Sequence, residues 1–574
     1  MDAKFQRIAE IFAERNLRPP DLKMLRPNVR LYEIIAIQPN GSIATEEDFI
    51  GSADRETNQR KFTAFLHLAT EKQIEVALSP EYSCPWDVIA NALRSGIVPD
   101  IGNIWILGCE AITPDELNRI VTAHPDVEWI YETLTLGTGR FYDPIVYVLQ
   151  TRTVHDEPKI AVVVQFKTQP MGGDPFERDR IICGETIYIW HNPDDNIRLI
   201  TLICSEALGF DQHARQECRI AVHPYLIFHP QLNGDPCHVD IGAYRDQLFA
   251  QESSRAVEVL TLNWARGFSL PTKSPSLYGA SAIFTKSADF DLTDYRIEAN
   301  HRKGLFYAQW FARRTHLGYL SYDEHIFHFR MPKVKQEVEA VSVKRTGPQM
   351  LDLWSWDIKQ LDWILSDFAN DGYSDLCASF NQPSCDYFAT APHSAIDRER
   401  LLTMSAGKLT SGRNWHQIEV MESFKTESDE RSKRLTFTHE QTSRSRDFRL
   451  EHLARYTKLQ TAILSEPLHF PRTIEDLKGD CGLRPPRPID NFRYNLFSTS
   501  GLKASATVIY LGLVPPSTAN QLCDNLMRDW GKEDTRRLVV WYEFQNATQC
   551  KHAPLPSITD DLEPPASIAN ALRL

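Results

Sequence analysis

The chain has 574 residues, of which 42% are hydrophobic and 24% are charged. This composition excludes wholesale disorder and collagen-like or low-complexity classes, and the length predicts two or three domains. A formal net charge of -13 argues against a broad nucleic-acid or anionic-membrane surface as the main activity.

Residues 1–27 predict a helical N-terminal extension. Charges run through MDAKFQRIAEIFAERNL, which therefore lacks the apolar core of a signal peptide, and Ile8, Ile11 and Phe12 recur at helical spacing. The sequence contains no run of eighteen apolar residues, so it predicts no membrane span. The eleven cysteines show no CxxC pair and no zinc-type spacing, which indicates reduced thiols. We therefore expect a cytoplasmic protein with no membrane contact, no metal and no other cofactor.

Residues 28–335 predict an α/β domain. Short β-branched runs alternate there with segments of helical period, and such runs are typical of strands that are covered on both faces. The predicted helices span 58–72 and 85–96. The predicted strands span 29–37, 74–78, 104–109, 145–150, 160–166, 197–203, 225–228, 257–263 and 280–284.

Residues 345–574 predict an additional α+β region, because the regular alternation ends near residue 340. The aromatic segment 350–365 predicts a packed helix, 422–449 an exposed helix or linker, and 505–545 a strand–helix–strand unit. The region has no GxxxxGK[ST] or SGGxDS-like loop, which argues against a glutamine-dependent NAD synthetase. We expect it to recruit a protein partner or to tune recognition; packing for stability alone is the alternative.

Three chemically active residues each directly follow a predicted buried strand. They are Glu81 after IEVALSP, Lys167 after IAVVVQF and Cys204 after IRLITLI. Ligands gather at the carboxyl ends of strands in α/β sheets, so we expect these side chains to meet in one pocket. A predicted helix follows Cys204, and its N-terminus would favour the thiolate.

This trio is sufficient for acyl transfer through sulfur. Glu81 could take the thiol proton and later activate water, and Cys204 could attack the carbon of an amide or nitrile. Lys167 could supply positive charge to the developing oxyanion.

The order of these motifs resembles the carbon–nitrogen hydrolase superfamily of nitrilases and aliphatic amidases. The resemblance covers residues 28–330 and rests on short motifs in the family's order. The motifs are Gln38 in IIAIQP, Pro80 and Glu81 in SPEYS, FYDPIVYVL, Lys167 in QFKTQP, Gly184, Cys204 and Glu206 in LICSEA, Arg255, Ala256, Glu258 and Asn263 in SSRAVEVLTLNWA, Gly279 and Ser281 in YGASAIF, and KGLFYAQ.

The resemblance implies a four-layer α-β-β-α sandwich and a Glu-Lys-Cys triad. It also implies a second glutamate that orients the lysine, for which Glu177 is the candidate and Glu185 the fallback. The Ser205 backbone N–H would complete the oxyanion site. Self-association is usual in the family, so we expect a homodimer or higher oligomer.

The leading interpretation is a thiol-dependent hydrolase of a small-molecule amide, nitrile or carbamoyl compound, acting through a covalent acyl-Cys204 intermediate. Two alternatives remain. One is a catalytically silent scaffold of the same fold whose C-terminal region recruits partners. The other is an acyltransferase that passes the acyl group to an amine.

Overall fold

The chain divides into two compact units, of which the first contains Met1–Ala369 and the second contains Asn370–Met421 and Arg431–Leu574. Each unit is described by itself. The computed structural model describes residues 3–26, 29–134, 140–171, 175–220, 222–234, 243–244, 247–249, 257–271, 274–276, 281–286, 290–291, 293–310, 315–332, 345–368, 376–378, 394–407, 443–464, 470–490, 493–530 and 537–552. Arg255, Ala256 and Gly279 lie outside them.

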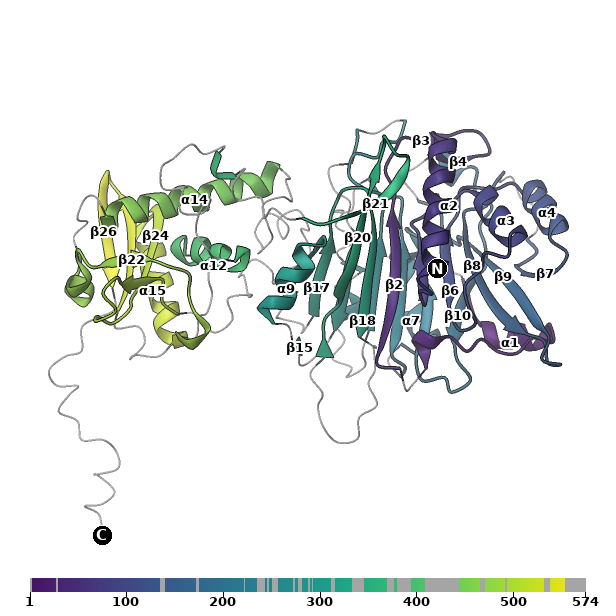
Figure 1. Cartoon of the computed structure of the whole chain (residues 1–574), viewed down its shortest axis with the longest axis horizontal. Coiled ribbons are helices and arrows are strands. Elements are labelled where there is room, and N and C mark those ends of the chain that lie inside the picture. Colours follow the sequence, from purple (N-terminus) through teal and green to yellow (C-terminus); the bar gives the residue numbers. More distant parts are fainter. Residues whose placement is uncertain are drawn as a thin grey trace, which may run out of the picture. The chain divides into compact units, whose positions relative to one another are not determined.

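Two large sheets dominate the described part of the first unit (Figure 1). The nine-stranded sheet has the order β21 (Asp362–Ser366), β20 (Gln349–Asp357), β18 (His325–Pro332), β2 (Leu31–Gln38), β5 (Val76–Leu78), β6 (Ile104–Gly108), β8 (Pro144–Arg152), β9 (Pro158–Phe166) and β7 (Val127–Ile130). The eight-stranded sheet has the order β1 (Lys4–Arg7), β10 (Thr186–His191), β11 (Arg198–Thr201), β12 (Tyr225–Pro230), β13 (Val257–Leu262), β14 (Ala282–Lys286), β17 (Thr315–Leu320) and β16 (Leu305–Trp310).

The two sheets face each other across one hydrophobic core. Ile34 and Val76 of the nine-stranded sheet belong to the same buried cluster as Leu199, Leu226 and Ile283 of the eight-stranded sheet. Successive side chains of a strand point to opposite faces, so each sheet can bury one face here and offer the other to helices. The α/β class predicted from the sequence is therefore confirmed.

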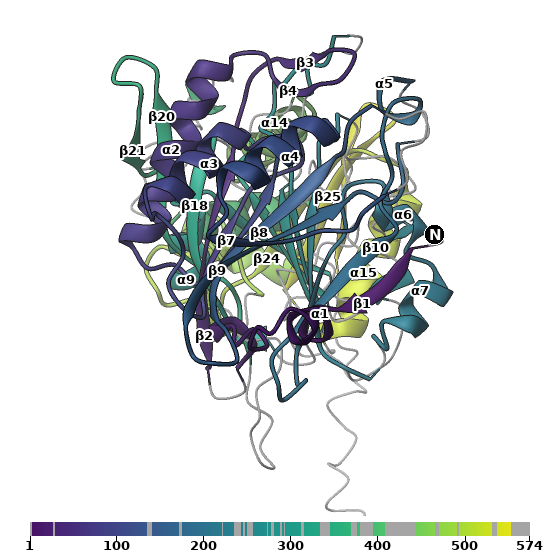
Figure 2. The same ribbon diagram turned by 90° about the vertical axis from the view of Figure 1, so that its right-hand side faces the viewer.

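Helices cover the outer face of the nine-stranded sheet. Ile35 and Ile37 of β2 point away from the shared core and pack in a second cluster with Phe62 and Phe65 of α2 and Ile89 of α3. Figure 2 shows α2, α3 and α4 side by side over this face. The helices of the first unit include α1 (Ile8–Glu14), α2 (Arg55–Glu71), α3 (Trp86–Arg94), α4 (Pro114–Ala123), α5 (Pro175–Arg178), α6 (Glu206–Gly209), α7 (Gln212–Glu217) and α9 (Asp294–His301). The shorter elements are β3 (Ile43–Thr45), β4 (Ile50–Ser52), β15 (Phe290–Asp291), β19 (Arg345–Thr346) and the 3-10 turn η1 (Lys23–Leu25).

The N-terminal segment is not a purely helical extension. Lys4–Arg7 forms strand β1, which pairs in parallel with β10 and becomes an edge of the eight-stranded sheet. The helix starts only at Ile8, and the apolar spacing that predicted it places Ile8 and Phe12 in the shared core. The first residues are therefore part of the first unit.

The prediction of a helix over 350–365 is wrong. Strands β20 and β21 form an antiparallel hairpin there, in which Trp356 lies opposite Trp363. Pairing of β20 with β18 adds the hairpin to the nine-stranded sheet. The structure therefore places these two strands in the first unit, not in the accessory region that the sequence analysis began at residue 345. Aromatic residues also favour strands, and tertiary pairing decided the outcome.

The described part of the second unit is built on a three-stranded sheet, with helices packed on both of its faces. Val508 of β24 (Thr507–Leu513) packs with Leu401 and Leu453 of two helices, whereas the neighbouring Ile509 packs with Cys523 of the helix between β24 and β25 (Leu538–Phe544). β24 and β25 pair in parallel. The elements are α12 (Ala395–Ser405), α14 (Ser443–Leu464), η4 (Arg472–Leu477), β22 (Cys481–Leu483), η5 (Pro488–Asp490), β23 (Leu496–Ser498), β24 (Thr507–Leu513), α15 (Pro516–Trp530), β25 (Leu538–Phe544) and β26 (Ala547–His552).

The segment 422–449 is only partly described. Residues 422–442 lie outside the described residues, and Ser443 begins α14. Arg449 of this helix is buried, and its guanidinium pairs with Glu399 of α12. The end of the segment is therefore a packed helix and not an exposed one.

Two expectations from composition concern the described residues as a whole. Among them, no helix is both long and apolar enough to cross a membrane. The cysteines that the structure describes are free thiols.

Candidate active site

Glu81 lies in a turn that follows β5 and is held by its backbone. The turn passes so close to β6 that a Cβ atom on Gly108 would come within 2.1 Å of the Pro80 carbonyl oxygen. Only glycine allows this approach. The indole N–H of Trp264 donates to the Glu81 carbonyl oxygen at 2.8 Å. The carboxylate is therefore fixed at the end of a buried strand, as its sequence position predicts.

Lys167 follows β9 directly and is fully buried. Its backbone N–H donates to the Asp143 carbonyl oxygen at 2.9 Å, which continues the pairing of β8 with β9. Its own carbonyl oxygen accepts from the Gly184 N–H at 2.8 Å. A Cβ on Gly184 would lie 2.6 Å from the Phe166 carbonyl oxygen, so this close contact also requires glycine.

Cys204 lies in the turn between β11 and the single-turn helix α6. Its backbone adopts φ +40, a left-handed conformation that is uncommon for a residue with a side chain. The Cys204 N–H donates to the Pro230 carbonyl oxygen at 2.9 Å. Nε2 of His229 lies 2.9 Å from the Cys204 carbonyl oxygen. Contacts to β12 therefore stabilise the strained turn.

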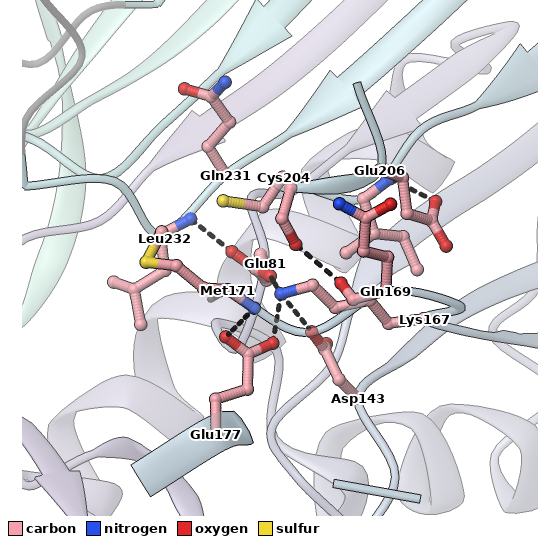
Figure 3. Close-up of polar contacts among 12 residues, drawn as sticks. Glu81, Asp143, Lys167, Gln169, Met171, Glu177, Cys204, Glu206, Gln231 and Leu232 are labelled. Atoms are coloured by element: carbon pink, nitrogen blue, oxygen red, sulfur yellow. Dashed lines mark hydrogen bonds and ion pairs between the residues drawn. The ribbon is translucent and has the colours of Figure 1, made fainter. Parts of the chain in front are cut away.

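The Lys167 ammonium lies among three carboxyl groups. Its Nζ is 2.7 Å from Glu81 Oε1, 3.4 Å from Asp143 Oδ2 and within hydrogen-bond distance of Glu177 Oε1 (Figure 3). Glu185, the fallback for the second glutamate, is instead exposed and pairs with Lys4. The structure thus brings Glu81, Lys167 and Glu177 together.

Two backbone N–H groups complete the hydrogen bonding of the glutamates. The Leu232 N–H donates to Glu81 Oε2 at 2.6 Å, and the Met171 N–H donates to Glu177 Oε2 at 3.2 Å. Each glutamate therefore accepts from Lys167 and from one amide. Burial alone would lower the pKa of Lys167, but the neighbouring carboxyl groups, Glu177 and Glu81 first among them, outweigh burial and raise it. The lysine is consequently held as an ammonium ion.

The Cys204 sulfur points into this cluster, on the side of Glu81 and Leu232 (Figure 3). Burial raises the pKa of the Cys204 thiol well above its ordinary value, the charge of Glu81 raises it further, and Lys167 offsets only part of this. The expectation that a helix N-terminus favours the thiolate is not met, because α6 spans only Glu206–Gly209. The resting sulfur is a neutral thiol beside a carboxylate.

The side chain and the backbone N–H of Ser205 have different roles. Its hydroxyl donates to the Gln169 carbonyl oxygen at 2.6 Å, which ties the turn after β11 to the loop after Lys167. Among the residues that the structure describes, no group accepts a hydrogen bond from the Ser205 backbone N–H. This amide, next to the sulfur-bearing residue, can therefore serve an incoming ligand.

Sequence reasoning missed the function of Glu206, although the residue was noted in the motif. Its carboxylate accepts from the Ile203 N–H at 2.7 Å and from the Thr168 N–H at 2.7 Å. It therefore clamps the turn that carries Cys204 to the residue that follows Lys167. Burial raises the pKa of Glu206 to about 7.

Sequence reasoning also missed Asp143, which lies just before β8. Its only signal is its position at the start of the strand that pairs with the lysine strand, inside the segment FYDPIVYVL. It is fully buried, and burial and the charge of Glu81 raise its pKa well above the usual range.

Three carboxyl groups could in principle bind a metal ion. Oxygens of Glu81, Asp143 and Glu177 lie within 4.8 Å of one another. The Lys167 ammonium already contacts all three, so this cluster is built around a side-chain cation and does not fit a metal.

Comparison with known proteins adds little. No family model and no curated protein matches the chain. Solved structures that match include a glutamine-dependent NAD(+) synthetase from Cytophaga hutchinsonii, which is 9% identical, with a TM-score of 0.27, over 44% of this chain and 39% of that chain. The match thus spans well under two thirds of the synthetase. A similarity this weak assigns neither fold nor activity to the chain.

Proposed function

We propose that the chain is a thiol-dependent carbon–nitrogen hydrolase. It would act on a non-peptide amide, nitrile or carbamoyl compound through Glu81, Lys167 and Cys204, with a covalent acyl-Cys204 intermediate. The observation that carries the proposal is the buried ion cluster of Lys167 with Glu81 and Glu177, into which the Cys204 sulfur points.

The energetics of this cluster support a catalytic purpose. Burying an ammonium and several carboxyl groups costs several kcal/mol per ion before their attraction is counted, so such clusters are a poor way to stabilise a fold. Perturbed titratable groups gather at functional sites for this reason. We also propose the nitrilase-like α-β-β-α sandwich for this unit, which two facing sheets and the helices over the nine-stranded one support.

The first half-reaction follows from the protonation states. Because the resting thiol is neutral and lies beside Glu81, its proton would pass to the Glu81 carboxylate as the sulfur bonds to the substrate carbon. The electron pair of the C=O bond moves to oxygen. The Lys167 ammonium and the Ser205 N–H would stabilise that oxyanion.

Collapse of this intermediate restores the C=O bond and breaks the C–N bond. Glu81 returns its proton to the departing nitrogen, so that ammonia or an amine leaves and the acyl group remains on Cys204. Water then attacks the thioester carbon and gives one proton to Glu81. The acid is released as the sulfur regains that proton. A nitrile would add the S–H group of Cys204 across its C≡N bond to give a thioimidate; one water would then add to that carbon and ammonia would leave, which gives the same acyl-Cys204 thioester.

In this proposal the second unit contributes no group to the chemistry. We propose that it acts in recognition or recruits a protein partner, and that the first unit self-associates as a homodimer or larger assembly. A chain ending at Ala369, which keeps β20 and β21, would separate recognition from stability. It should hydrolyse a small amide at the full-length rate; an insoluble or inactive product would favour a structural role for the second unit.

The experiment that tests the proposed activity is intact mass spectrometry after incubation with a panel of amides, nitriles and carbamoyl compounds. An adduct on Cys204 that decays in water with release of ammonia would support hydrolysis. An adduct that persists until an amine is added would support acyl transfer. The Cys204→Ala variant should form no adduct, whereas Cys183→Ala, which removes another thiol near the cluster, should form it normally. A folded wild type that forms no adduct with any compound would favour the silent scaffold.

A further inference from the structure

The carboxyl group of Asp143 differs from its two neighbours in the cluster. Glu81 and Glu177 each accept hydrogen bonds from Lys167 and from a backbone N–H. Asp143 is completely buried, and its side-chain oxygens form no hydrogen bond of regular geometry among the described residues; the polar side chains that interact with its carboxyl group are Glu81, Tyr82 and Lys167. Its nearest cation, Lys167 Nζ, is 3.4 Å from Oδ2. A buried carboxylate without regular hydrogen bonds is costly.

The net charge of the cluster also indicates that one of its carboxyl groups is protonated. One ammonium and three ionised carboxylates would leave a net charge of -2 in a volume where the carboxyl oxygens lie within 4.8 Å of one another. Like charges at this separation cannot all stay ionised in a buried site, so at least one of the three groups keeps a proton. Asp143 keeps it most easily, because among the described residues no backbone N–H donates to its carboxyl group, whereas one donates to each glutamate.

We propose that Asp143 is a neutral carboxylic acid in the resting protein and acts as a positioning residue. As a neutral group it leaves the Lys167 ammonium to Glu81 and Glu177, and it adds no negative charge where the oxyanion forms. Its effect on catalysis rests on the proposed function, but its protonation does not.

The surroundings of Asp143 agree with this assignment. Burial is the largest cause that raises its pKa, and Glu81 and Glu177 add to the effect, while Lys167 opposes them. The titratable groups whose charges interact with it are Glu81, Tyr82, Cys109, Lys167, Glu177 and Cys183. Of these, Lys167 alone is a cation.

The consequence for turnover has a definite sign. Above the pKa of Asp143, a third carboxylate would compete for Lys167 and add negative charge beside the oxyanion. The rate should therefore fall at alkaline pH. Asp143→Asn replaces a neutral acid by a neutral amide, so that this alkaline limb should move to higher pH or disappear, with less than about a tenfold loss of kcat/KM at the optimum. Asp143→Glu, which keeps the titration, should keep the limb.

Infrared spectroscopy tests the protonation directly and does not depend on turnover. On the Cys204→Ala background at pH 7 to 8, the protein should show the C=O stretch of a protonated carboxyl group, and the band should shift with ¹³C-labelled aspartate. The band should be lost in the Cys204→Ala, Asp143→Asn double variant.

Three results would overturn the proposal. One is the absence of a protonated aspartate band, a second is an Asp143→Asn protein that folds but loses more than about a hundredfold in kcat/KM, and a third is an alkaline limb that Asp143→Asn leaves in place. If no substrate forms an adduct on Cys204, the proposed function fails, yet the infrared band still decides whether Asp143 is neutral.

Discussion

Each unit contains a carboxylate-centred network, and the two networks are built in opposite ways. In the first unit, Lys167 and three acids share a fully buried site, and burial raises the pKa of Asp143. In the second unit, Asp480 accepts from the Ser500 N–H at 2.9 Å, the Ser500 hydroxyl at 2.6 Å and the Ser498 hydroxyl at 3.0 Å. These hydrogen bonds lower its pKa.

The difference teaches what each network is for. Hydroxyl and amide donors, together with the Lys503 ammonium at 3.3 Å, surround the partly exposed Asp480 carboxylate and tie the start of β22 to the turn after β23 at little cost, because water still reaches the charge. Opposed charges in a dry site are costly, and they make proton transfer between neighbours easy. The arrangement around Asp480 is typical of a structural role, and the cluster around Lys167 is typical of a catalytic role.

The largest effect should come from the sulfur. Cys204→Ala should lower turnover by at least about a thousandfold, because it removes the nucleophile and leaves only binding and oxyanion stabilisation. Unfolding free energy should change by only about 1 kcal/mol, since a single atom is lost. Steady-state kinetics and urea unfolding measure the two quantities. Turnover that survives this substitution would remove Cys204 from the mechanism.

The ammonium should dominate the stability of the buried network. Lys167→Met leaves its acids without their cation, so the free energy of unfolding should fall by about 3–5 kcal/mol. Lys458 in the second unit pairs with Glu543 at 3.0 Å on the surface, and Lys458→Met should cost less than about 1 kcal/mol. Equal losses in urea unfolding would show that burial does not distinguish the Lys167 cluster from the Lys458–Glu543 ion pair.

Glu206 should give the buried network a pH-dependent stability. Its pKa is raised from 4.5 to about 7, so the folded protein holds the proton more tightly than the unfolded chain. Ionisation therefore costs stability as the pH rises from about 4.5 to 7, by up to about 3 kcal/mol.

Glu206→Gln cannot ionise and should escape that cost. The wild-type unfolding free energy minus that of the variant should thus decrease across this pH range, as measured by urea unfolding at several pH values. Glu185→Gln, at an exposed acid, should show no such trend. A pH-independent difference for Glu206→Gln would contradict the assignment.

The smallest effect should come from Asp480, and its pH dependence should have the opposite sign. Because hydrogen bonds lower its pKa, its contribution to stability is present above the unfolded pKa, near 3.8, and is lost as the pH falls through the folded value. Asp480→Asn should therefore lower the melting temperature slightly at neutral pH and not in strong acid. If Asp480→Asn lowered the melting temperature at neutral pH as much as Lys167→Met does, this prediction would be wrong.

Sequence could place three site residues because each follows a buried strand. The local pattern of β5, β9 and β11 predicts Glu81, Lys167 and Cys204 at strand ends, but β11 belongs to the other sheet, and only the packing of the two sheets brings Cys204 to the cluster. Asp143 precedes its strand, and only the antiparallel pairing of β8 with β9 brings it to Lys167. The local sequence pattern does not reveal that pairing.

Other features depended on contacts between distant segments. Glu206 acts through the backbone of Thr168, which the spacing of the motif does not reveal. The residues 350–365 are aromatic enough for a helix or a strand, and pairing with β18 decided between them. Likewise β1 is a strand because β10 offers it an edge.

The pairing of β2 with β18 has a consequence for biosynthesis. The Gln38 side chain donates to the Ser321 carbonyl oxygen, 283 residues further along the chain, and β18 lies between β2 and β20 in the sheet. At about 5–20 residues per second, a ribosome needs roughly 15–60 s to make that stretch. During this time β2 has an open edge that can pair with other chains. Slower translation or a lower chaperone concentration should therefore lower the yield of folded protein, although the stability of the folded molecule is unchanged.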